Sequence, residues 1–183
     1  MRLFAAMPLP EGAHSLAVAE LRILRDLGWP VRWVREDGLH ITLKFFGEVA
    51  PDRLDTIAEM LGFCVDRMTP MALAVTGGGV FPHPSKPRIL RLDVSSVPAL
   101  ELLQDRIERG GERIGFPPEG RPFHPHLTLG RVREGHRLPA DAIARLESIP
   151  EQPPFMADRL VLYESELGPN GPAYRVRSEF VFT

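Results

Sequence analysis

Hydrophobic residues recur along the chain at two spacings, one typical of helices and one typical of strands. Apolar positions three or four residues apart predict four helices, over residues 11–27, 51–66, 97–114 and 139–149. Pro51 at the start of the second segment and Gly28 after the first are typical of helix ends. On the first helix, the face expected to be buried carries Leu16, Ala19, Ile23 and Leu27.

Shorter apolar or alternating segments between these helices predict strands. They cover residues 2–7, 31–35, 39–46, 71–76, 89–94, 126–132, 158–164 and 173–182. The glycines at 77–79 are expected to form a flexible turn, because no Gly-Lys-Ser/Thr follows and a P-loop is excluded. Strands and helices are mixed without a regular βαβ rhythm, which favours an α+β fold with largely antiparallel sheets.

One short motif occurs twice, as His40-Ile41-Thr42-Leu43 and as His126-Leu127-Thr128-Leu129. Side chains alternate along a strand, so His40, Thr42 and Lys44 should share one face. The other face should carry Ile41, Leu43 and Phe45. We expect the first face to line a cleft and the second to belong to the core, with the same division in the second copy.

Each copy presents an imidazole beside a hydroxyl. An imidazole exchanges protons near neutral pH, and a hydroxyl can donate to a phosphoryl oxygen. Two facing pairs would supply a base, an acid and two neutral donors, which suits displacement at phosphorus. A histidine that merely satisfies a strand would explain one copy as well, but two copies together favour chemistry.

Several other polar residues admit two interpretations. Strict alternation places Arg131 on the face of Leu127 and Leu129, so Arg131 is structural unless the strand ends or bulges near Gly130. His124 lies two residues before His126, but no Cys or carboxylate cluster completes a metal site. The basic residues that either attract RNA or form a solvated face are Lys44, Lys86, Arg88, Arg91 and Arg121.

Composition narrows the class of protein. The 183 residues are 44% hydrophobic and 25% charged, as in ordinary globular proteins. A net charge of −2 gives no support for duplex binding, although a local basic pocket for a nucleotide or an RNA end is permitted. The single Cys64 should be buried and excludes an intrachain disulfide. The N-terminus does not resemble a signal peptide, and we expect a cytoplasmic location.

With these residues in view, the chain resembles the 2H phosphoesterase superfamily, whose hallmark is a tandem HxTx motif. The blocks that carry the resemblance are Leu39–Gly47, Phe123–Arg131, Lys86–Leu90, Leu162–Ser165 and Gly171–Tyr174. Together they are similar to the bacterial and archaeal RNA 2',3'-cyclic phosphodiesterases, formerly described as 2'-5' RNA ligases. The resemblance runs over nearly the whole chain.

The resemblance implies a single bilobed α+β domain over residues 1–183, with two pseudo-symmetric, mostly antiparallel sheets and flanking helices around a central cleft. It implies hydrolysis of 2',3'-cyclic phosphate ends of RNA or nucleotides to 2'-phosphates. His40 would be the proton donor and His126 the proton acceptor, with Thr42 and Thr128 holding phosphoryl oxygens. No cofactor, metal or membrane is implied, and we expect a monomer. Two alternatives stay open: a 2'-5' RNA ligase using the reverse reaction, and a non-catalytic RNA-end binding module.

Overall fold

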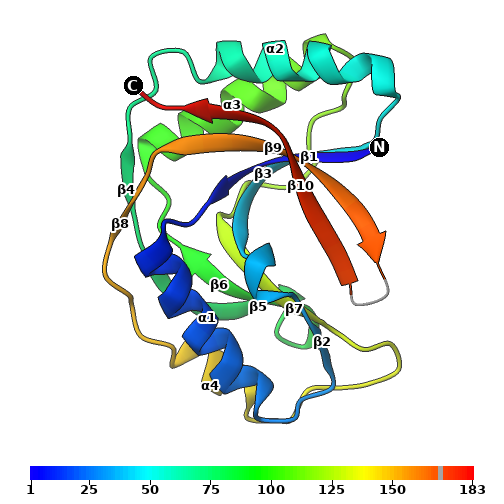
Figure 1. The fold of residues 1–183 in the computed structure, drawn as a ribbon. Coiled ribbons are helices and arrows are strands. Elements are labelled where there is room, and N and C mark those ends of the chain that lie inside the picture. Colours follow the sequence, from blue (N-terminus) through cyan, green and yellow to red (C-terminus); the bar gives the residue numbers. More distant parts are fainter. Residues whose placement is uncertain (169–170) are drawn as a thin grey trace.

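The structure is a computed structural model that describes residues 1–168 and 171–183 (Figure 1). Its helices are α1 (Glu11–Arg25), α2 (Leu54–Cys64), α3 (Pro98–Arg113) and α4 (Ala142–Glu147). Its strands are β1 (Arg2–Pro8), β2 (Val31–Trp33), β3 (His40–Glu48), β4 (Met71–Leu73), β5 (Val75–His83), β6 (Lys86–Val94), β7 (His126–Val132), β8 (Phe155–Ala157), β9 (Arg159–Gly168) and β10 (Gly171–Val181). Each of the four expected helices is present.

Eight strands form one sheet in the order β10-β9-β1-β3-β7-β6-β5, with β2 beside β7. All of its strand pairs are antiparallel. The central strands β3 and β7 meet through a single pairing, Ile41 opposite Leu127. The α+β antiparallel fold is therefore confirmed, and the two expected sheets are the two halves of one sheet joined at this point. Strands β4 and β8 form a separate two-stranded sheet.

The helices cover the outer faces of the two halves (Figure 1). Helices α2 and α3 pack together, with α3 against β3 and α2 against β10, while α4 packs against β5. Helix α1 lies on the same side as α4. The central strands β3 and β7, which begin at His40 and His126, join the two halves.

The three glycines at 77–79 lie within strand β5 and not in a turn, so that expectation is wrong. A Cβ at Gly78 would lie 2.8 Å from both Ile149 Cδ1 and the Leu146 carbonyl, at the end of α4. A Cβ at Gly79 would lie 3.0 Å from the Arg91 guanidinium. At Gly78, glycine is therefore required by close packing against the end of α4 and not by a turn, whereas the Arg91 side chain beside Gly79 can move aside. The short strand β8 was also absent from the expected set.

Helix α1 buries a different face from the one expected. Its buried residues are Ala13, Ala17, Val18, Leu21 and Leu24. Leu16, Ile23 and Leu27 are instead 43%, 49% and 47% exposed. Both sets have helical spacing, so periodicity alone does not separate them. The alanines on the buried face let the helix backbone approach the core closely.

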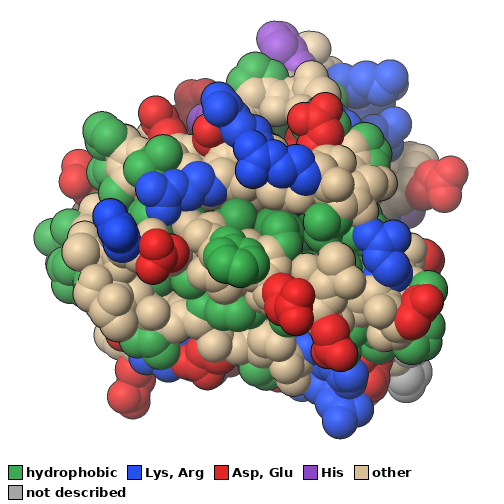
Figure 2. All heavy atoms as spheres, turned by 90° about the horizontal axis from the view of Figure 1, so that it is seen from above, with side chains coloured by type: hydrophobic (Ala, Val, Ile, Leu, Met, Phe, Trp, Pro, Cys, Tyr) green, Lys and Arg blue, Asp and Glu red, His purple; other side chains and the backbone are tan. Residues whose placement is uncertain are grey.

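One hydrophobic cluster runs through both halves of the molecule and includes the buried Cys64, as expected. Outside it, Phe63 on α2 is 82% exposed. The face seen in Figure 2 carries hydrophobic groups at its centre, with acidic and basic side chains intermingled around them. It is therefore not a continuous basic surface. In the described ranges no helix is long and apolar enough to cross a membrane.

Candidate active site

Strand β3 contains a β-bulge inside its copy of the motif. The residues on either side of Leu43, Thr42 and Lys44, pair with consecutive residues of β1, which leaves Leu43 without a partner. A bulge adds one residue to a strand and so reverses the faces of the side chains that follow it. His40 and Thr42 consequently share their face with Phe45 and not with Lys44.

Lys44 and Phe45 therefore lie on the faces opposite to those expected. Lys44 is 4% exposed, and its Nζ donates to a Glu108 carboxylate oxygen 2.6 Å away on the side covered by α3. Phe45 is 62% exposed and packs against Phe4, with ring centroids 5.8 Å apart. Placing Lys44 in the cleft and Phe45 in the core was wrong, because strict alternation does not allow for the bulge between them and the histidine.

Strand β7 bulges at the equivalent position. The residues on either side of Leu129 pair with consecutive residues of β6. Arg131 is therefore exposed on the same face as His126, and its charge acts on the phenol of Tyr174, whose pKa is raised mainly by burial. The bulge near Gly130, one of the two interpretations open from the sequence, is confirmed. A Cβ at Gly130 would lie 2.6 Å from a methyl group of β2, so only glycine fits there.

His40 lies among aromatic rings. Its ring centroid is 4.9 Å from that of Phe4, 5.1 Å from that of Tyr174 and 6.0 Å from that of Tyr163. Desolvation by this surrounding lowers the pKa of His40 to about 4, against a hydrogen bond to the backbone of Gly38 that raises it. Positive charge on His126 lowers this pKa further, so the two imidazoles are close enough to interact.

A backbone carbonyl two residues earlier in the chain fixes the ring of His126. Its Nδ1 lies 2.7 Å from the carbonyl oxygen of His124, and since a carbonyl only accepts, Nδ1 carries the proton. The other ring nitrogen, Nε2, then has a free lone pair when the ring is neutral. Phe81 contacts the ring edge-on, with centroids 4.9 Å apart. Desolvation lowers the pKa of His126, while the charge of Asp93 opposes the change.

Asp93 connects two side chains beside His126. Its Oδ1 lies 2.7 Å from Arg91 Nε and 2.9 Å from His124 Nε2. Burial works against ionisation, yet these hydrogen bonds hold the pKa of Asp93 below its usual range. The Arg91 guanidinium also lies over the Phe81 ring, 3.9 Å from its centroid. Asp93 and Arg91 were not singled out together, although their spacing of two in a strand indicated a common face.

Of the residues predicted for the site, His40, Thr42, His126 and Thr128 are all half-buried on two neighbouring strands. Arg131 joins them because of its bulge. The aromatic residues beside His40 were missed, since they come from β1, β9 and β10, far from the motif in sequence. In the part of the chain that the structure describes, no group of three or more His, Cys, Asp or Glu side chains is placed to hold a metal ion.

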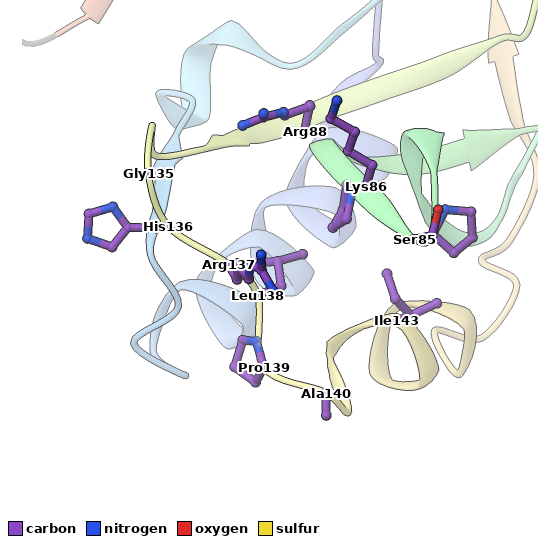
Figure 3. Close-up of a pocket in the computed structure, with 12 residues that line it drawn as sticks. Ser85, Lys86, Arg88, Gly135, His136, Arg137, Leu138, Pro139, Ala140 and Ile143 are labelled. Carbon is purple, nitrogen blue, oxygen red and sulfur yellow. The ribbon is translucent and has the colours of Figure 1, made fainter.

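A separate hollow lies at the other end of β7. We name it the hairpin pocket; it has a volume of about 790 Å³ and is lined by Pro84, Ser85, Lys86, Pro87, Arg88, Gly135, His136, Arg137, Leu138, Pro139, Ala140 and Ile143. None of the motif residues lines it (Figure 3). The hairpin pocket is therefore separate from the motif residues at the junction of β3 and β7 and requires its own explanation.

Similarity to known proteins extends over nearly the whole chain. A family model described as the 2'-5' RNA ligase superfamily matches residues 10–169. A curated RNA 2',3'-cyclic phosphodiesterase of Methanothermobacter thermautotrophicus is 33% identical over 177 residues, which cover 95% of each chain. One of Thermotoga maritima is 33% identical over 183 residues, covering 100% of this chain and 96% of its own.

Solved structures show the same fold. A crystal structure of a Thermus thermophilus protein matches with a TM-score of 0.82 at 27% identity, covering 100% of this chain and 98% of that one. Apo E. coli LigT matches with a TM-score of 0.78 at 23% identity, covering 100% of this chain and 97% of that one.

Proposed function

The chain belongs to the 2'-5' RNA ligase superfamily, and we propose that it hydrolyses 2',3'-cyclic phosphate ends of RNA with His40 and His126 as acid and base. The activity class is that of its curated relatives, which are RNA 2',3'-cyclic phosphodiesterases and hence phosphoric diester hydrolases. The proposal adds the residues, their roles and the 2'-phosphate product.

One observation carries the proposal. Each half of the sheet presents a histidine and a threonine on one face at the junction of β3 and β7, and the bulge directly after each threonine turns Phe45 and Arg131 to that face as well. Proton transfer and hydrogen-bond donation to phosphate need this combination of groups. A pair of histidines placed only to satisfy two strands would not need the same bulge twice.

In the proposed reaction, water attacks phosphorus while its proton passes to Nε2 of His126. The new P–O bond forms as the bond from phosphorus to the ribose 3' oxygen breaks. His40 donates its proton to that departing oxygen, which leaves a 2'-phosphate and a free 3' hydroxyl. Thr42 and Thr128 donate hydrogen bonds to the non-bridging oxygens, and Arg131 attracts the phosphate charge.

The pKa of His40 shapes how this reaction runs. In the free protein at neutral pH His40 is almost wholly neutral, because its pKa is about 4. A bound phosphodiester places a negative charge beside the ring and raises that pKa, so substrate binding favours the protonated acid. His126 can take a proton at Nε2 because its Nδ1 proton is already engaged by the His124 carbonyl.

The test is hydrolysis of a 2',3'-cyclic nucleotide by His40→Ala and His126→Ala. Each variant should lose about 10²–10⁴-fold in kcat, the usual contribution of a positioned acid or base. His83→Ala, at an exposed position on the β5–β6 hairpin, is the matched control and should keep full activity. Identification of the product as 2'-phosphate completes the assignment, and a 3'-phosphate product would contradict the acid role of His40.

Ligation is the second candidate, since the family is described as a 2'-5' RNA ligase superfamily. Joining would use the same two histidines in reverse, with a 5' hydroxyl in place of water. Incubating RNA halves that end in 2',3'-cyclic phosphate and 5' hydroxyl, and comparing joined with hydrolysed product, measures the balance. We expect hydrolysis to dominate because water is abundant. Tight binding without conversion would instead indicate an RNA-end binding module.

A further inference from the structure

The hairpin pocket combines cationic and apolar walls. Lys86 and Arg88 at the start of β6 run along its upper side, and Arg137 lies on the loop that follows β7 (Figure 3). Leu138 of that loop and Ile143 of α4 supply apolar surface lower down. Its volume of about 790 Å³ is of the size that small-molecule sites have.

Charge distinguishes this pocket from the rest of the surface. Lys86, Arg88 and Arg137 are exposed, and none of the described residues that line the pocket is an aspartate or glutamate. Across residues 1–168 and 171–183, none of the three cations is within 4.0 Å of a carboxylate oxygen, whereas many other basic residues are paired. Three unneutralised cations around one hollow repel each other, in a protein whose net charge is −2. Such a site favours an anion.

Strand β7 links the pocket to the catalytic histidines. It starts at His126, passes Arg131 and continues into the loop that lines the pocket. Ile89 of β6 pairs with Arg131, so Arg88 is only one residue further along the neighbouring strand. The five residue steps from His126 to Arg131 correspond to about 16 Å along the strand. Along this part of the chain the pocket lining begins only beyond Arg131, at Gly135, so one nucleotide cannot occupy both places.

We propose that the hairpin pocket binds a nucleotide of the RNA chain upstream of the cyclic end, with its phosphate on Lys86, Arg88 and Arg137 and its base against the apolar wall. This inference rests on the proposed function. A 2',3'-cyclic phosphate closes the 3' end, so the rest of an RNA substrate can extend only in the 5' direction. Arg131 lies between the two sites, on the path the backbone would follow.

The consequence is a preference for RNA over mononucleotides. A cyclic mononucleotide contacts only the site at the histidines, whereas an oligonucleotide also binds in the hairpin pocket. We expect kcat/KM for a cyclic-phosphate tetranucleotide to exceed that for the mononucleotide by about tenfold or more, the effect of charged hydrogen bonds to phosphate. That advantage should fall as salt rises, because counterions compete for the same phosphates.

The experiment compares wild type with the triple variant Lys86→Gln, Arg88→Gln, Arg137→Gln. A matched triple variant, Arg67→Gln, Arg109→Gln, Arg113→Gln, changes the net charge equally at exposed positions on α3 and the turn after α2. The pocket variant should lose the tetranucleotide advantage and keep wild-type turnover of the mononucleotide, and its salt slope should fall by about 0.7 for each phosphate contact removed. The control should keep both activities.

Three results would overturn the inference: equal kcat/KM for both substrates in wild type, an unchanged advantage in the pocket variant, or equal losses in the two triple variants. Failure of the proposed function looks different, because the mononucleotide would then not be hydrolysed at all. In that case, fluorescence anisotropy of a labelled tetranucleotide ending in 2'-phosphate tests the pocket by binding alone. Equal affinity of wild type and pocket variant would overturn it there too.

Discussion

Burial of neutral His40 should make the protein less stable in acid, and replacing His40 should remove part of that loss. The folded protein lowers the pKa of His40 to about 4, whereas the unfolded chain has the ordinary value near 6.5. Above pH 6.5 the ring is neutral in both states and contributes nothing to the pH dependence. As pH falls from 6.5 to about 4, the unfolded chain binds the proton first, so the free energy of unfolding decreases.

The size of this effect follows from the two pKa values. Each unit of difference is worth about 1.4 kcal/mol, so at pH 4 the penalty from His40 reaches about 3 kcal/mol. The His40→Gln variant has no titrating ring and therefore lacks this free-energy penalty at pH 4. Whatever the substitution costs at pH 7, the variant should gain about 3 kcal/mol relative to wild type when both are compared again at pH 4.

Urea unfolding of both proteins at pH 7 and pH 4 measures the difference directly. Thr42→Ser is the matched control, since it changes a neighbouring side chain that does not titrate, and its effect should be the same at both pH values. If His40→Gln and wild type lose the same free energy between pH 7 and pH 4, His40 is not desolvated in the folded state. The explanation given for its surroundings would then be wrong.

Further predictions concern activity and packing. Because the pKa values of His40 and His126 are both lowered, kcat/KM for a cyclic nucleotide should peak below pH 6.5 and fall about tenfold per unit above it; a plateau extending to pH 8 would contradict this. Lys44→Met leaves the nearly buried Glu108 carboxylate with only the neutral donors of Gln104 and the Glu119 amide, and should cost about 3–5 kcal/mol in urea unfolding, with part of the loss recovered by also replacing Glu108 with Gln. Gly78→Ala should cost about 1–3 kcal/mol, because the added methyl meets the end of α4 at 2.8 Å.

Much of the fold could be predicted from spacing because the helices and most strands are regular. The errors arose where two patterns compete or where a pattern is interrupted. On α1, the stripe through Leu16 and the stripe through Leu21 have the same helical period, and only packing against the sheet selects the second. In β5, glycines typical of a turn form a strand, because α4 packs closely over Gly78.

Strand alternation predicted the faces of the side chains up to the threonine of each motif and not beyond it. Alternation placed His40 and Thr42 correctly on one face, since both precede the bulge. One residue later the same rule failed for Lys44 and Phe45. A bulge depends on how the neighbouring strand pairs, which a single segment does not encode. The sequence also left open which face of β7 carries Arg131, and a bulge in this second copy of the motif decides it.

The side chain that follows the bulge differs between the two motif strands, and this difference bears on which histidine is the acid. Beyond its bulge, β3 presents Phe45 and β7 presents Arg131. Desolvation lowers the pKa of both rings, to about 4 for His40, whereas the hydrogen bond of His126 to the His124 carbonyl acts against this change at His126. A ring that holds its proton weakly is the stronger acid once substrate charge has protonated it. The aromatic rings beside His40, which the repeated motif does not contain, therefore support the proposed acid role of His40.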